Sequence, residues 1–180
     1  MIELVAGDIT RLGGTPFESS AIVNAANSHL LAGSGVCGSI FRAAGRELLE
    51  SACIEVAPCP TGEARITPAF KLAAQGVRYI IHAVGPRYLD YSPREAEVLL
   101  QSAYVSAVQC ALAAKVESVA FPSLSTGIFG FPLERAAQIS IEVLQSVDRP
   151  DLRIRLVAFD KETEREWSAQ LEKLTQDVGE

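Results

Sequence analysis

Two glycine-rich segments have the backbone chemistry best suited to holding an anion. The first, LLAGSGVCGSIFRAAG at residues 30–45, contains Gly33, Gly35 and Gly38, and the second, PSLSTGIFGFP, covers residues 122–132. Neither is a P-loop, because no Gly-Lys-Ser/Thr follows the glycines. Glycine lets backbone N–H groups approach an anion without interference from a Cβ atom, and a helix start adds partial positive charge. Facing each other, the two segments would suit a diphosphate, whereas two tight turns without a ligand are the alternative.

Three polar side chains lie where strands are expected to end. Asn24 and Asn27 belong to IVNAANS, and Asp8 belongs to AGDIT. Asparagine is poor inside strands and good in turns, and aspartate is a good N-cap, so all three could be purely structural. Alternatively, the amides could bind ribose hydroxyls, and the Asp8 carboxylate could accept a hydrogen bond from the exocyclic amine of adenine.

Cys37 is a candidate nucleophile within the first segment. A thiolate is favoured near a helix N-terminus. However, the sequence shows no base partner, and His82 lies in an apolar strand where a core histidine is expected. We therefore favour a small buried thiol at this position. Four cysteines without a C-x-x-C pair, and two histidines, predict neither a metal site nor a disulfide framework, and no cofactor is expected.

Short apolar strands alternate with amphipathic helices, which predicts an α/β sandwich of three layers. The interval between residues 64–68 and 79–83 suits neighbouring or antiparallel strands, so a mixed, mostly parallel sheet is expected. Ser92-Pro93-Arg94-Glu95 is a capping box that should begin a long helix. The expected strands are Ile2–Ala6, Ala21–Asn24, Ala64–Pro68, Tyr79–Ala83, Val119–Pro122 and Leu152–Phe159. The expected helices are Cys37–Val56 with a break near Gly45, one from Ser92 to Leu112, one from Pro132 to Leu144, and a closing helix with Trp167, Leu171, Leu174 and Val178 facing inward.

Length and composition limit the classes of protein to consider. The 180 residues suit a single domain covering residues 1–180. A net charge of −6 without a basic stripe argues against nucleic acid as a partner. The sequence contains no run of 18 or more apolar residues, so we expect no membrane span and no membrane partner. The N-terminus does not resemble a signal peptide, so a cytoplasmic location is expected. A monomer is expected by default.

Taken together, these segments resemble the macrodomain family, whose members bind ADP-ribose. The resemblance covers nearly the whole chain and lies in the order and spacing of its motifs. The matching segments are Gly7-Asp8-Ile9-Thr10, Ile22-Val23-Asn24-Ala25-Ala26-Asn27-Ser28, Gly33-Ser34-Gly35-Val36, Cys59-Pro60-Thr61-Gly62-Glu63-Ala64, Ile81-His82-Ala83-Val84-Gly85-Pro86 and Ser125-Thr126-Gly127-Ile128-Phe129-Gly130.

The resemblance implies a role for each matching position. Asp8, with Ile9 beside it, would recognise adenine, and Phe159 would cover the ring by stacking. Asn27 would lie at the distal ribose, with Phe129 packed nearby. The diphosphate would be held between backbone amides of the two glycine segments, namely Gly35 and Val36 on one side and Ser125, Thr126, Gly127, Ile128 and Phe129 on the other. Gly33 and Cys37 are further substrate-binding candidates in the first segment.

The resemblance also implies hydrolysis of ADP-ribosyl esters, either on Asp or Glu of a mono-ADP-ribosylated protein or in O-acetyl-ADP-ribose. The chain departs from the best-known hydrolase branch, G-V-D-G-x-I-H, because Cys37 replaces a proposed aspartate base and Phe41 replaces a histidine. A similar G-V-C run occurs in the alphavirus macrodomains, which retain hydrolase activity. We therefore expect a hydrolase in which the ligand diphosphate activates water and Asn27 and Asn24 are the catalytic candidates. A non-catalytic reader of ADP-ribose and an ADP-ribose 1″-phosphate phosphatase are the alternatives.

Overall fold

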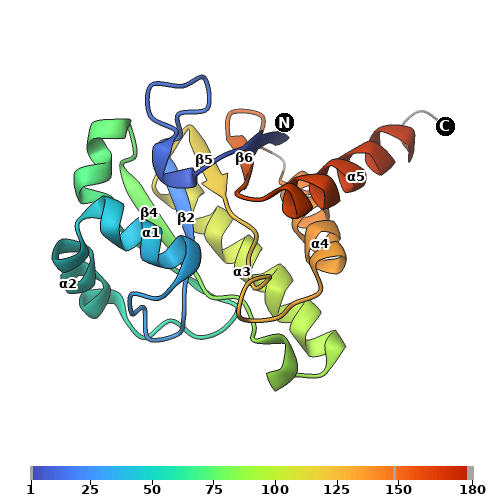
Figure 1. Ribbon diagram of the computed structural model, residues 1–180, viewed down its shortest axis with the longest axis horizontal. Helices are drawn as coiled ribbons and strands as arrows, with labels where there is room; N and C mark the ends of the chain where they lie inside the picture. Colours follow the sequence, from blue (N-terminus) through green and yellow to red (C-terminus); the bar gives the residue numbers. More distant parts are fainter. Residues whose placement is uncertain (1, 148, 178–180) are drawn as a thin grey trace.

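The computed structural model describes residues 2–147 and 149–177, which form one six-stranded sheet covered by helices on both faces (Figure 1). The strand order is β1-β6-β5-β2-β4-β3, and only β3 runs antiparallel to its neighbour. This confirms the mixed, mostly parallel sheet and the three-layer fold. The strands are β1 (Ile2–Ala6), β2 (Ala21–Ala25), β3 (Ala64–Pro68), β4 (Tyr79–Ala83), β5 (Ser118–Phe121) and β6 (Arg153–Ala158).

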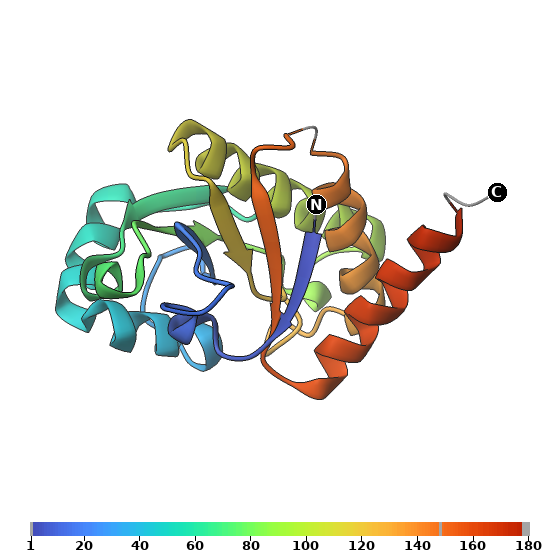
Figure 2. The same ribbon diagram turned by 90° about the horizontal axis from the view of Figure 1, so that it is seen from above.

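The helices divide between the two faces of the sheet (Figures 1 and 2). One hydrophobic core lies under α1 and α2, and a larger one lies under α3, α4 and α5. The α-helices are α1 (Gly35–Ala44), α2 (Arg46–Val56), α3 (Pro93–Ala113), α4 (Leu133–Gln145) and α5 (Lys161–Asp177). Three short 3₁₀ helices, which the sequence did not predict, are η1 (Ile9–Arg11), η2 (Phe70–Gln75) and η3 (Tyr88–Asp90).

Local signals in the sequence place several helix boundaries correctly. The expected break near Gly45 separates α1 from α2, and Gly45 has a φ of +94° that side-chain-bearing residues rarely adopt. Ser92 and Glu95 form the expected capping box at the start of α3. In α5, Trp167 is fully buried and donates a hydrogen bond from Nε1 to Ser140 Oγ at 3.0 Å. Val178, expected on the same face, lies outside the described residues.

α3 is the one described helix that is also long and apolar enough to cross a membrane. The sequence excluded such a span because no run of apolar residues is long enough. In the structure the apolar face of α3 packs on the sheet, where Leu100, Ala103, Tyr104 and Ala107 are fully buried. These contacts are those of a core helix, because they bury the face that lipid would otherwise cover.

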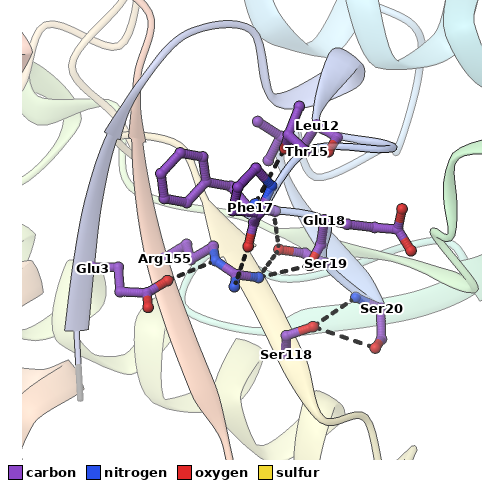
Figure 3. Close-up of polar contacts among 10 residues, drawn as sticks. Glu3, Leu12, Thr15, Phe17, Glu18, Ser19, Ser20, Ser118 and Arg155 are labelled. Carbon is purple, nitrogen blue, oxygen red and sulfur yellow. Dashed lines mark hydrogen bonds and ion pairs between the residues drawn. The ribbon is translucent and has the colours of Figure 1, made fainter.

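A buried arginine holds the segment between η1 and β2 against the sheet (Figure 3). The Arg155 side chain lies on β6, is 2 % exposed, and pairs with Glu3 on β1 at 2.8 Å. Its guanidinium also donates to the carbonyl oxygens of Pro16 and Glu18 at 3.1 and 2.6 Å and to Ser19 Oγ at 3.1 Å. This segment directly follows η1, so Arg155 ties the chain after Asp8 and Ile9 to the sheet.

Candidate functional site

The described residues form one large cavity, of about 520 Å³, at the carboxyl ends of the parallel strands. Open α/β sheets place ligands at this edge, and pockets of this volume commonly hold small molecules. Every predicted site residue except Asn24 lines the cavity. These are Asp8, Ile9, Asn27, Gly33, Gly35, Val36, Cys37, Ser125, Thr126, Gly127, Ile128, Phe129 and Phe159.

The first glycine segment contains the N-terminus of α1, whose first residues line the cavity. Ser34 is the N-cap residue and makes no side-chain capping bond, and Gly35 starts the helix with a φ of +58°. The first N–H groups of a helix have no acceptor within it. Gly35, Val36 and Cys37 therefore present backbone donors and the positive end of the helix dipole, which suits a phosphate group.

Gly38 serves close packing within this segment and does not line the cavity. A Cβ atom at Gly38 would lie 2.5 Å from the carbonyl oxygen of Gly33, a separation that real Cβ atoms essentially never show. The missing side chain therefore lets the loop around Gly33 fold back over α1. Of the three glycines that the sequence singled out, Gly33 and Gly35 border the cavity and Gly38 makes that arrangement possible.

Gly38→Ala should accordingly weaken binding of a nucleoside diphosphate such as ADP. The added Cβ must push the Gly33 carbonyl away, which displaces the backbone donors that follow it. We expect about tenfold weaker binding, the equivalent of about one hydrogen bond, measured by calorimetric titration with ADP. Alanine is the better helix former, so helix content should not fall, and unchanged affinity would contradict this role for Gly38.

The second glycine segment is held from several sides. Its start is fixed by the hydroxyl of the fully buried Tyr104, which accepts a hydrogen bond from the Leu124 backbone N–H at 3.2 Å. Burial raises the pKa of Tyr104 to about 12, so this hydroxyl stays protonated. Within the segment, the Phe131 N–H donates to the Ser125 carbonyl at 2.9 Å, and Ser125 has a φ of +65°. Hydrogen bonds within the protein therefore hold the backbone of this segment.

Asp8 has the capping role that its sequence position allowed, and it also lines the cavity. As the N-cap of η1, its Oδ1 accepts hydrogen bonds from the Thr10 backbone N–H at 2.9 Å and the Thr10 hydroxyl at 2.7 Å. Arg11 Nε lies 3.7 Å from Oδ2. Asp8 also lines the cavity beside the buried Ile9. Capping fixes the direction of the carboxylate, which is what recognition of an amine donor requires.

Asn27 is tied to the backbone of Leu31. Its Nδ2 donates to the Leu31 carbonyl at 2.8 Å, and its Oδ1 accepts from the Leu31 N–H at 3.1 Å. This paired contact holds the amide group in one orientation at the cavity wall.

Asn24, the other catalytic candidate, is fully buried and does not line the cavity. Its Nδ2 lies 3.1 Å from His82 Nδ1 and 3.7 Å from Cys37 Sγ. The sequence analysis expected Asn24 to contact the substrate. Its buried position away from the cavity does not allow such a contact. β2 ends at Ala25, so Asn24 still belongs to the strand and faces the core, whereas Asn27 lies beyond it.

Cys37 and His82 agree with the structural interpretations favoured from the sequence. Cys37 is 6 % exposed and packs in the core under α1 and α2 while lining the cavity. His82 is fully buried, and burial lowers its pKa to about 4. All four cysteines are free thiols. No cluster of three or more candidate metal ligands occurs within residues 2–147 and 149–177.

Sequence reasoning missed several residues of the cavity wall, of which Ser39 and Arg42 are chemically the most distinct. Arg42 Nη2 donates to Ser39 Oγ at 3.1 Å. A helical signal could have identified them, because Gly35, Ser39 and Arg42 are spaced i, i+4 and i+7 along one face of α1. The other missed residues are Gly7, Ala25, Ala26, Ser34, Pro122, Ser123, Val157, Asp160 and Thr163.

Comparison with known proteins identifies the family and several relatives of this chain. The Macro domain family matches residues 23–140 of the chain. O-acetyl-ADP-ribose deacetylase of Escherichia fergusonii is 43 % identical, over 91 % of this chain and 91 % of that protein. Mouse ADP-ribose glycohydrolase MACROD1 is 42 % identical, over 89 % of this chain and 49 % of that protein. Among solved structures, a mutant of the Oceanobacillus iheyensis macrodomain with ADPR is 35 % identical and superposes with a TM-score of 0.85, covering 97 % of this chain and 94 % of that one.

Proposed function

The chain belongs to the macro domain family, and from this premise we propose that its cavity binds ADP-ribose. The observation that carries the proposal is the order of chemical groups along the sheet edge. Asp8 follows β1, the second glycine segment follows β5, and Asn27 follows β2. Because β6 and β5 lie between β1 and β2, three strand spacings of about 4.8 Å separate the two outer groups by roughly 14 Å.

This order matches the order of groups in ADP-ribose. At one end, the Asp8 carboxylate would accept a hydrogen bond from the adenine amine. At the other end, the Asn27 amide would bind the distal ribose. Between them, backbone donors at the start of α1 and in the second glycine segment suit the diphosphate. Phe159, 81 % exposed at the adenine end, is free to stack on the base, which would contribute about 1–3 kcal/mol.

We further propose that the protein hydrolyses ADP-ribosyl esters, those on Asp or Glu of a modified protein and that of O-acetyl-ADP-ribose. Two relatives are named for hydrolysis of ADP-ribosyl compounds, which supports this class of reaction. Among the described residues that line the cavity, the carboxylates are Asp8 and Asp160, which follow the neighbouring strands β1 and β6 at the adenine end. A diphosphate oxygen of the ligand would therefore orient and polarise the attacking water, while Asn27 holds the distal ribose.

The same distribution of carboxylates favours a second candidate function. A module that binds ADP-ribose on modified proteins without cleaving it would need the same cavity, but it would need no base near the ester. Such a reader would keep the affinity for ADP-ribose and release nothing from a modified protein. Calorimetry with ADP-ribose, run beside an assay for ADP-ribose release from a glutamate-modified protein, separates the two functions: binding without release would identify the reader.

Asn27→Ala is expected to slow release of ADP-ribose from that substrate about tenfold or more, since an oriented contact at the reacting sugar is lost. Phe159→Ala is the matched comparison at the far end of the cavity. It should raise KM about fivefold with little change in kcat, because stacking on adenine is the same in the ground state and the transition state. Full-speed release by Asn27→Ala would contradict its role. Proteins modified separately on Glu or Asp, Ser and Arg would identify the linkage that is cleaved.

A further inference from the structure

We propose that a buried row of polar side chains, running from Thr67 on β3 through His82 and Asn24 to Cys37 on α1, positions Asn27 at the cavity. The row lies on the face of the sheet covered by α1 and α2. The inference rests on the proposed function, because Asn27 is the group proposed to hold the distal ribose.

The inner part of the row lies across three neighbouring strands. Asn24 on β2 and His82 on β4 are register partners, so both side chains point to the same face. Asn24 Nδ2 lies 3.1 Å from His82 Nδ1, and His82 Nε2 lies 3.0 Å from Thr67 Oγ1. With the amide donating to Nδ1, the neutral imidazole carries its proton on Nε2 and donates it to Thr67. Each member of this part thus fixes the orientation of the next.

The outer part of the row connects Asn24 to the cavity wall. The same Nδ2 of Asn24 lies 3.7 Å from Cys37 Sγ, and Cys37 Sγ lies 3.8 Å from the Leu31 carbonyl oxygen. That carbonyl oxygen also accepts the hydrogen bond from Asn27 Nδ2 at 2.8 Å. The Leu31 carbonyl is therefore shared by the row and by the side chain that faces the ligand, and a shift of Cys37 moves the acceptor that orients Asn27.

Stability alone does not account for this row. Burying polar groups costs free energy, and hydrogen bonds offset this cost only in part here, because Asn24 Oδ1 is buried with no hydrogen-bond partner among residues 2–147 and 149–177. The neighbouring positions on the same face, Ile22 and Ile80, show that the sheet packs well with aliphatic side chains. Buried groups that weaken the fold are expected where they orient a functional group.

The geometry makes Cys37 a positioning residue and gives it no activating base. His82, the buried imidazole of the row, faces Asn24 and Thr67, and its low pKa keeps it neutral. The hydrogen bonds of the Cys37 thiol in the described structure are with Asn24 and with the Leu31 carbonyl oxygen. Both contacts orient a thiol, and neither removes its proton.

The experiment compares affinity for ADP-ribose with affinity for ADP, which lacks the distal ribose. Thr67→Val and Cys37→Ala interrupt the row at its two ends, and Cys37→Ser retains a hydroxyl that can bond to Leu31. Cys59→Ala is the control, because Cys59 is a fully buried thiol of the same core outside the row. Calorimetry measures both dissociation constants, thermal melting checks folding, and kcat and KM are measured on the glutamate-modified substrate.

We expect Thr67→Val and Cys37→Ala to weaken ADP-ribose binding about threefold to tenfold, the equivalent of one lost hydrogen bond, with ADP affinity unchanged. Cys37→Ser should recover part of this loss, and Cys59→Ala should match the wild type in both affinities. Turnover should fall through kcat in the same two variants. A variant of Thr67 that did not fold would leave the comparison of Cys37→Ala with Cys37→Ser to decide.

The proposal is overturned if Cys37→Ala and Thr67→Val bind ADP-ribose as the wild type does, or if ADP affinity falls equally. Equal loss of both ligands would mean that the row only maintains the shape of the pocket. Failure of the proposed function has a different signature, since the wild type itself would then not bind ADP-ribose. Wild-type binding without turnover would leave the affinity comparison intact, because that comparison does not depend on catalysis.

Discussion

Replacing Arg155 with alanine should lower the free energy of unfolding by about 3–5 kcal/mol, because the change removes a buried charge that several groups depend on. The 2 % exposed guanidinium pairs with Glu3 and satisfies the carbonyl oxygens of Pro16 and Glu18 (Figure 3). With alanine at this position, these carbonyl oxygens lose their donors. A cavity also remains between β6 and the segment before β2. Urea denaturation at pH 7 measures the effect.

Arg149→Ala is the control for this prediction. Arg149 forms an equally short pair with Asp151, at 2.7 Å, but at the solvent-exposed surface. Water replaces such a partner easily, so stability should stay close to that of the wild type. Arg155→Lys should recover only part of the loss, because an ammonium cannot reproduce the planar set of donors. Equal stability of the Arg155→Ala and Arg149→Ala proteins would show that the buried arginine does not hold this segment.

Acidification from about pH 6.5 to pH 4 should remove about 3 kcal/mol of stability through His82 alone, the equivalent of its lowered pKa. Burial lowers the folded-state pKa of His82 from 6.5 to about 4. The unfolded chain therefore binds a proton first as the pH falls through 6.5, and the folded state does so only near pH 4. Between these values the unfolded state gains protons that the folded state does not, so stability declines as the pH decreases.

His82→Gln isolates this contribution, because glutamine does not titrate and retains an amide for Thr67 and Asn24. Its stability should fall less than that of the wild type between pH 7 and pH 4, while the carboxylates affect both proteins alike. Urea denaturation at several pH values measures the difference. Parallel pH profiles for the two proteins would show that His82 is not held neutral in the folded state.

Much of the fold was predictable because its signals are local. Alternation of apolar strands and amphipathic helices predicted the layers. The short interval between residues 64–68 and 79–83 suited neighbouring or antiparallel strands, and β3 and β4 are both. The capping box at Ser92 marked the start of α3. The 3₁₀ helices were missed because each is a short turn, too brief to show a period in the sequence.

The candidate site was also predictable where its signals are local, and not where they depend on the tertiary structure. Glycine-rich segments after strands, and polar residues at strand ends, indicated about half of the residues of the cavity wall, because strand ends meet at one edge of a parallel sheet. The burial of Asn24 was not readable from the sequence. The sequence placed Asn24 at the end of a strand and Asn27 beyond it, and the structure extends β2 by one residue to Ala25. Pairing of β2 with β4 directs the Asn24 amide towards His82 in the core, and Asn24 does not line the cavity.

By itself, the sequence determined the order of the elements, the two glycine segments and the family, since these depend on neighbours along the chain. Tertiary structure alone decided which side chains meet. Arg155 reaches Ser19 across 136 positions of sequence, and Asn24 meets His82 across 58. Gly38 matters for the carbonyl of Gly33 that packs over it, and not for its own conformation. Such contacts follow from strand order and register, which bring distant residues together and leave no local signal in the chain.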